Sequence, residues 1–144
     1  MAADVSANLK DWSTTANSNQ PSGSTNVGLN LDDNIRELQK VVRQDLAHKG
    51  ADIASAGTVD LGAIPGVFHD ITGTTTVTGL GTVSAGIWKW VKFEGITTLI
   101  HHATSLILPG GAPIVTAVGD TALFFSEGSG NWRCVFYQRA ASAP

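Results

Sequence analysis

The chain has few of the side chains on which most enzymes and disulfide-stabilised proteins depend. Charged residues make up 15% of the 144 residues, against an average of roughly 25% in soluble domains. Cys134 is the only cysteine, which excludes an internal disulfide framework and is typical of assembly in a reducing compartment. A weakly charged surface is often covered by other protein, because exposed charge keeps an isolated domain soluble. The composition therefore favours assembly over acid–base chemistry.

Other signals are also missing from the sequence. The start of the chain, MAADVSANLKDW, lacks the basic-then-apolar order of a signal peptide. No apolar run approaches the roughly 20 residues of a membrane-spanning helix. The net charge of −3 gives no basic footprint for nucleic acid. We therefore expect a protein made in the cytoplasm, with neither a membrane nor nucleic acid as a partner.

The sequence divides into three segments. Residues 1–29 are polar and unpatterned and predict an extended N-terminal arm, in which Trp12 is a candidate anchor because a large ring tends to be buried. Residues 30–50 predict one amphipathic helix of about Leu31 to Ala47 and a linker, with Gly50 as a plausible stop. Residues 51–144 predict a β-sandwich domain.

The helical segment has apolar residues at spacings of four, three, four and four, which place them on one face. This stripe has to be buried against the β domain or a neighbouring subunit, and the sequence leaves both open. Leu38 and Val42 are its candidate interaction residues. The stripe consists of Leu31, Ile35, Leu38, Val42 and Leu46.

Short strands separated by glycine and threonine fill the rest of the chain. Their intervals of about ten residues predict a mainly β fold, a jelly-roll-like antiparallel β-sandwich. GTTTVTG is read as a threonine-rich strand, and SEGSGN as a turn between antiparallel strands. WRCVFYQR is expected to direct Trp132, Cys134 and Phe136 to one face.

No catalytic or metal motif is found. His101–His102 and His69–Asp70 are the only possible metal constellation, but neighbours in a strand point to opposite faces, so we interpret these histidines as surface or interface residues. Ser105 near His102 lacks both a nucleophile elbow and an orienting carboxylate. We predict no catalytic residue, no metal site and no cofactor.

Trp88 and Trp90 lie on one face of a predicted strand, opposite Ile87, Val91 and Phe93. Two tryptophans side by side can pack in a core or a subunit interface, and they can also stack on a sugar ring. Both residues are candidate interaction residues.

Two stretches resemble segments of tailed-bacteriophage virion proteins. WSTTANSNQPSGSTNVGLNLDDNIRELQKVVR resembles a Trp/Ser/Thr/Asn-rich stretch followed by a helix of the D-x-I-R-x-L-x-x-V-V-R type. The pieces ITGTTTVT, SLILPGG, GDTA and GSGNWRCVFYQR resemble a β module of phage tail-fibre and head-associated proteins. A tail fibre continues into repeats and a receptor-binding tip, whereas this chain stops soon after its last predicted strand. It is therefore more similar to a capsid cement or decoration protein, such as the jelly-roll cement protein of a Bordetella phage head.

The resemblance implies a non-enzymatic viral structural protein on the capsid surface of the virion. Its partners would be the major capsid protein and further copies of itself, with synthesis in the host cytoplasm. The alternative is a tail-fibre or baseplate-associated adhesin module that binds a host receptor or glycan.

Overall fold

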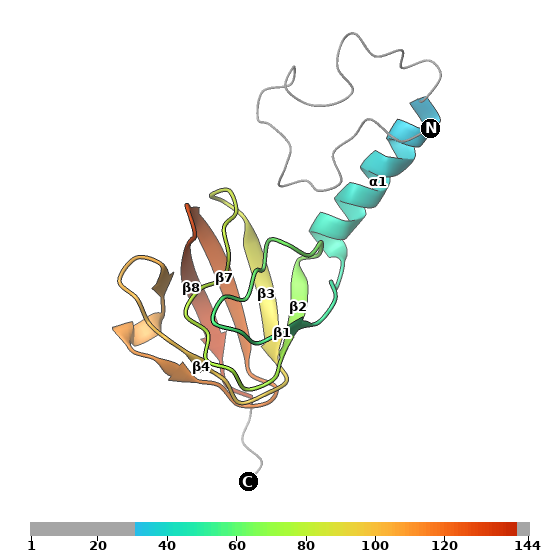
Figure 1. The fold of residues 1–144 in the computed structure, drawn as a ribbon. Coiled ribbons are helices and arrows are strands. Elements are labelled where there is room, and N and C mark those ends of the chain that lie inside the picture. The colour runs from blue at the N-terminus through green and yellow to red at the C-terminus, as the bar shows by residue number, and fades with distance from the viewer. Residues whose placement is uncertain (1–30, 141–144) are drawn as a thin grey trace.

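The computed structural model describes residues 31–140, which form one helix and a mainly β module (Figure 1). The helix, α1, spans Leu31–Ala47 and projects from the edge of the module. A 3₁₀ turn spans Pro109–Gly111. The strands are β1 (Ile53–Ala54), β2 (Phe68–Thr72), β3 (Trp88–Phe93), β4 (Thr98–Leu99), β5 (Leu106–Ile107), β6 (Ile114–Val115), β7 (Thr121–Gly128) and β8 (Asn131–Gln138).

A curled six-stranded sheet in the order β1-β2-β3-β7-β8-β5 dominates the module, and β4 and β6 form a separate two-stranded sheet. The mainly β, sandwich-like fold with one helix confirms the sequence prediction. The large sheet is mixed, however, and not antiparallel throughout: β1–β2, β2–β3 and β5–β8 are parallel. The connection between β2 and β3 is long enough to cross the module and return to the same end, as a parallel pair requires.

The core lies on the inner face of the large sheet. Phe93, Phe124 and Trp132 are fully buried there. Val59, between β1 and β2, and Leu80, between β2 and β3, belong to the same buried cluster. Since every residue of this cluster belongs to the β module, α1 stands outside the core.

The helix has the predicted bounds, Leu31–Ala47. Asp32 and Asp33 lie in its first turn, where the helix dipole favours negative charge. Arg43 donates a hydrogen bond to the carbonyl oxygen of Ala47 in the last turn. Within residues 31–140 the one helix is neither long nor apolar enough to span a bilayer.

The prediction of a threonine-rich strand at GTTTVTG is wrong. The segment runs extended and makes only isolated bridges, Val77 to Leu99 and Thr58 to Gly79. Gly73, which has a φ of 84°, turns the chain away from β2 before the threonines begin.

The predicted turn between the last two strands is confirmed. β7 ends at Gly128 and β8 begins at Asn131, so Ser129 and Gly130 form a two-residue loop. Both have positive φ angles, 55° and 80°, as the type I′ hairpin turn requires. This hairpin sets the register of the two longest strands.

Candidate interaction surface

The outward face of the large sheet carries a row of large apolar side chains. Phe68 of β2 pairs with Trp90 of β3. Leu123 of β7 pairs with Trp90 on one side and with Phe136 of β8 on the other. Paired residues direct their side chains to the same face of a sheet. The four side chains therefore form one apolar row across four strands.

A second row runs beside the first. Trp88 pairs with Phe125, and Phe125 pairs with Arg133. Trp88 is 43% exposed and Phe125 is 39% exposed, so solvent reaches both rings. Arg133 Nε lies 2.6 Å from Glu127 Oε1 in an exposed ion pair, which places charge at the end of this row.

A β-bulge places Phe136 on this face and adds Val135 to it. Leu123 pairs with Phe136, but Phe124 pairs with Cys134, so Val135 is an extra residue in β8. A bulge shifts the alternation of side chains by one residue. Phe136 is therefore 41% exposed on the outer face, and the expectation that it points inward with Trp132 and Cys134 is wrong. Val135 and Phe136 complete a set that we name the outer apolar face: Phe68, Trp88, Trp90, Leu123, Phe125, Val135 and Phe136.

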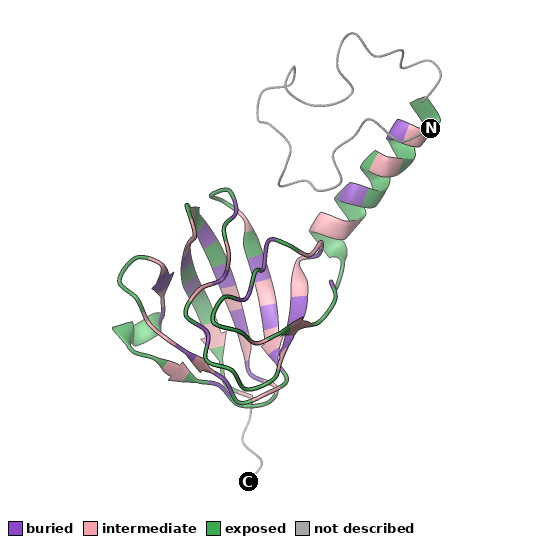
Figure 2. Cartoon of the chain, in the orientation of Figure 1, coloured by how far each residue is buried: buried purple, intermediate pink, exposed green. Residues whose placement is uncertain are grey.

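Contacts within the outer apolar face fix its aromatic rings. Trp90 meets Phe136 edge-on, with ring centroids 5.8 Å apart and an interplanar angle of 66°. This geometry is favoured by the ring quadrupoles. Trp90 is half-buried and Phe136 is exposed, so the pair presents an apolar surface to solvent. Figure 2 shows buried residues alternating with half-buried or exposed ones along the long strands of the sheet.

Paired charges border this face on β2 and β3. Asp70 Oδ2 lies 2.9 Å from Lys49 Nζ, and Asp70 Oδ1 lies 3.8 Å from Lys92 Nζ. Lys92 Nζ also lies 2.5 Å from Glu94 Oε1. The hydrogen bond to Glu94 and the charge of Asp70 raise the pKa of Lys92. An apolar centre with a paired polar rim is the anatomy of a protein–protein interface.

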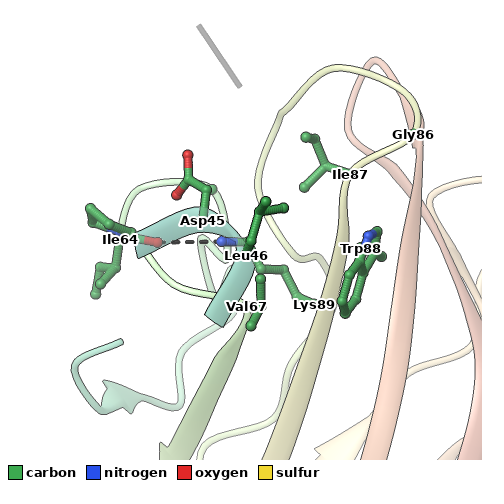
Figure 3. Close-up of a pocket in the computed structure, with 10 residues that line it drawn as sticks. Asp45, Leu46, Ile64, Val67, Gly86, Ile87, Trp88 and Lys89 are labelled. Carbon is green, nitrogen blue, oxygen red and sulfur yellow. Dashed lines mark hydrogen bonds between the residues drawn. The ribbon is translucent and has the colours of Figure 1, made fainter. Parts of the chain in front are cut away.

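A hollow of about 220 Å³ opens beside Trp88, at the foot of the helix (Figure 3). Leu46 lines it from α1, and Ile87 lines it from the residue before β3. Lys89 spans its base and donates hydrogen bonds to the carbonyl oxygens of Gly66 and, at 3.5 Å, of Ile64. The lysine amine thus holds the loop before β2, and the rest of the wall is mainly apolar.

The histidines make structural hydrogen bonds. His101 Nδ1 accepts the backbone N–H of Leu108 at 3.1 Å. His102 Nδ1 accepts the backbone N–H of Thr104 at 3.2 Å and of Ser105 at 3.1 Å. It is the amide of Ser105, and not its hydroxyl, that reaches the imidazole.

His69 and Asp70 point to opposite faces of β2, as strand alternation predicts. His69 is fully buried within the chain, so its interpretation as a surface or interface residue is wrong. Its two ring nitrogens each lie 3.2 Å from a carbonyl oxygen, one of Ala51 and one of Gly66. Burial lowers the pKa of His69, and the nearby Lys89 adds to that effect. Among the described residues, no three histidine, cysteine or acidic side chains gather in a group that could hold a metal ion.

Cys134 is buried on the inner face, as the sequence indicated. Burial raises the pKa of its thiol to about 11, and Sγ contacts the carbonyl oxygen of Phe136 at 3.1 Å. A thiol that stays protonated and buried is chemically inert.

The predicted interaction residues lie in two places. Trp88 and Trp90 share the outer apolar face. Leu38 and Val42 are exposed on α1 and do not join them. Trp12 lies outside the described residues. Sequence reasoning missed Phe125 and Phe136; strand alternation around the buried Phe124 was a signal for the former, whereas the bulge hid the latter.

No protein-family model, curated protein or solved structure matches this chain. The fold and the outer apolar face are thus the observations on which a function has to be argued.

Proposed function

We propose that this chain is a non-enzymatic viral structural protein that binds the outside of a phage capsid and cements its major capsid protein subunits. The observation that carries the proposal is the outer apolar face, where Trp88, Phe125, Val135 and Phe136 are all at least 39% exposed. A contiguous exposed patch of this kind on a folded domain marks a surface that other protein covers. The resemblance of the sequence to phage virion proteins supports the capsid as the partner.

The composition of the face suits docking onto protein. Tryptophan and phenylalanine are enriched in interface centres, because rigid rings bury a large area at a small cost in side-chain entropy. The ion pairs of Asp70 and Arg133 lie at its border, where they set orientation more than affinity. Repeated weak contacts gain strength when many copies dock on a lattice.

The first test locates the protein in particles. Virions of the phage that carries this chain are separated into heads and tails, and the copy number in each fraction is measured by quantitative mass spectrometry. Cement activity requires stoichiometric recovery with heads. Recovery in the tail fraction alone would reject the proposal.

The second test asks whether the outer apolar face makes the contact. The double variant Trp88→Ser, Phe125→Ser is expected to bind heads about tenfold more weakly or worse, since even 1.4 kcal/mol of lost contact has that effect. Val118→Ser is the matched control, because Val118 is 57% exposed but lies in the turn before β7. Equal head occupancy of the double variant and the control would show that another surface binds.

Carbohydrate binding by an adhesin module is the second candidate, favoured by the exposed ring of Trp88 beside Phe125. A planar aromatic ring open to solvent can stack on a sugar. A glycan array with the native chain and with Trp88→Ser separates the two functions. Specific glycan binding that Trp88→Ser abolishes, with no binding to heads, would favour the adhesin.

A further inference from the structure

The apolar stripe of α1 is not buried by the β module. Leu31 and Leu46 are each 56% exposed, and Ile35 is 46% exposed. Leu38 and Val42, between them, are 39% and 38% exposed. Figure 1 shows the helix projecting from the module, which it joins only at its C-terminal end. Helices in proteins draw most of their stability from packing of an amphipathic face, and the exposed stripe of α1 lacks such a contact among the described residues.

The stripe has the periodicity of a coiled coil. Ile35 and Val42 are seven residues apart and take the a positions of a heptad, and Leu31 and Leu38 take the d positions. β-branched residues at a with leucine at d are the combination found in parallel coiled coils. Val41, in the g position beside the seam, is buried and does not belong to the exposed stripe.

Charged side chains along the first three turns lie off this seam and pair within the helix. Arg36 Nη2 lies 3.1 Å from Asp32 Oδ2, and Arg36 Nη1 lies 3.2 Å from Asp33 Oδ1. Lys40 Nζ lies 2.9 Å from Glu37 Oε1. These residues occupy the b, c, e and f positions. The seam itself carries no charge until Asp45, at the last d position, where the helix meets the hollow.

We propose that the partner of this face is a second copy of the same chain, bound through a parallel, in-register coiled coil of α1 helices. A heptad seam is self-complementary in register, because each a layer and each d layer meets its own copy. The alternating Leu and Ile/Val layers therefore identify the occupant as another α1.

The apolar surroundings of the C-terminal end of α1 favour a parallel orientation of the two helices. Leu46 lines the hollow together with Ile87 and Trp88 (Figure 3). In a parallel pair the C-terminal ends of the two helices lie side by side, so the apolar surface of the stripe continues into both hollows. In an antiparallel pair the two C-terminal ends would be separated by the length of the helix, about 25 Å. Asp45 then marks the point at which the helices diverge toward their modules.

This inference does not rest on the proposed function, because self-association is measured on the isolated chain. Analytical ultracentrifugation at tens of micromolar should give twice the single-chain mass of 15.0 kDa. Leu38→Asp places a charge in a d layer and should yield the single-chain mass. Its control, Lys40→Asp, places the same side chain at an outward f position and should keep the native mass. Near-UV circular dichroism verifies that the β module of each variant remains folded.

Disulfide trapping tests the register without an introduced charge. In a Cys134→Ser background, Leu31→Cys should cross-link between copies on mild oxidation, because equivalent d positions meet only in a parallel pair. Lys40→Cys should not cross-link. A single-chain mass for the native protein, an oligomer that survives Leu38→Asp, or no cross-link through Leu31→Cys would each overturn the inference.

Discussion

Asp120 is fully buried at the start of β7 and accepts four hydrogen bonds. The backbone N–H groups of Ala117 and Ala140 donate to it at 2.8 and 2.7 Å. The Tyr137 hydroxyl donates at 2.5 Å, and Arg139 Nη1 donates at 3.3 Å. Burial alone would raise the pKa of Asp120, but the hydrogen bonds, with the charge of Arg139, lower it below the ordinary value of 3.8. This carboxylate fastens the end of β8 to the turn before β7.

Asp120→Asn should therefore lower the free energy of unfolding by about 2 kcal/mol at neutral pH, because an amide presents a donor to groups that are themselves donors. A carboxyl whose pKa is lowered in the folded state stabilises that state above pH 3.8, and the stabilisation is lost as the pH falls through the lower folded pKa. Urea denaturation at neutral and acid pH measures the difference between variant and native chain, which should shrink below pH 3.8.

Glu127→Gln is the matched control, since Glu127 makes an exposed ion pair with Arg133. Its effect on stability should stay within about 0.5 kcal/mol. An Asp120→Asn deficit of equal size at every pH would contradict the role given to the charge.

At the same scale, strand alternation is enough to place Trp88 and Trp90 on one face, because a strand without irregularities keeps its period of two. Strand alternation did not predict the correct face for Phe136. The extra residue Val135 is accommodated in the pairing with β7, and no glycine or proline in WRCVFYQR signals it. One irregular pair thus moves a phenylalanine from the predicted core to the outer apolar face.

At the scale of elements, the joint between α1 and β2 depends on a close approach of the backbone. Gly50 is buried and donates its N–H to the carbonyl oxygen of Phe68 at 2.8 Å. A Cβ at this position would lie 2.2 Å from His69 Cε1 and 2.4 Å from the carbonyl oxygen of Pro65. The helix ends at Ala47, so Gly50 does more than stop it: it lets the linker pass over the histidine.

Gly50→Ala should consequently destabilise the protein by about 2 kcal/mol, because the added methyl forces His69 or the loop at Pro65 to move. The urea denaturation midpoint measures the loss. Gly57→Ala is the control, since a Cβ there meets nothing within 4 Å. Equal denaturation midpoints for the two variants would show that the linker at Gly50 accommodates a methyl group without loss of stability.

Local patterns predicted some elements and not others. The bounds of α1 follow from a 3.6-residue period, and the β7–β8 hairpin follows from the glycine-containing turn. The parallel pairing of β2 with β3 depends on how residues 73–87 cross the module, which is a tertiary property. The same crossing explains why the threonines of GTTTVTG run extended without joining a sheet.

On the scale of the whole molecule, the chain separates folding from association. The hydrophobic core lies between Val59 and Cys134, all within the β module. Among the described residues, Val41 is the one buried apolar side chain that the core cluster does not include. The stripe of α1 and the outer apolar face, in contrast, leave large side chains in solvent. These two apolar surfaces, one on the helix and one on the sheet, are the ones for which we propose a second copy of the chain and the capsid as partners.

This division predicts that the β module folds without the helix. A fragment of residues 48–144 keeps the hydrogen bonds by which His48 and Gly50 hold the start of β2. It should show the near-UV circular dichroism of the full chain, since Trp88, Trp90 and Trp132 all lie within it. Its free energy of unfolding should match that of the Leu38→Asp variant, and it should sediment as a single chain.

A second fragment, residues 55–144, separates loss of the helix from loss of the sheet edge. It lacks β1, whose Ile53 pairs with Ile71 and packs against the core. Loss of that partly buried side chain alone should cost about 1–2 kcal/mol relative to the longer fragment, and loss of the hydrogen bonds made by His48 and Gly50 adds to this cost. If residues 48–144 fail to fold while the full-length Leu38→Asp variant remains folded, α1 contributes to the module itself. The helix would then be part of the folding unit, and the separation argued from the core would not hold.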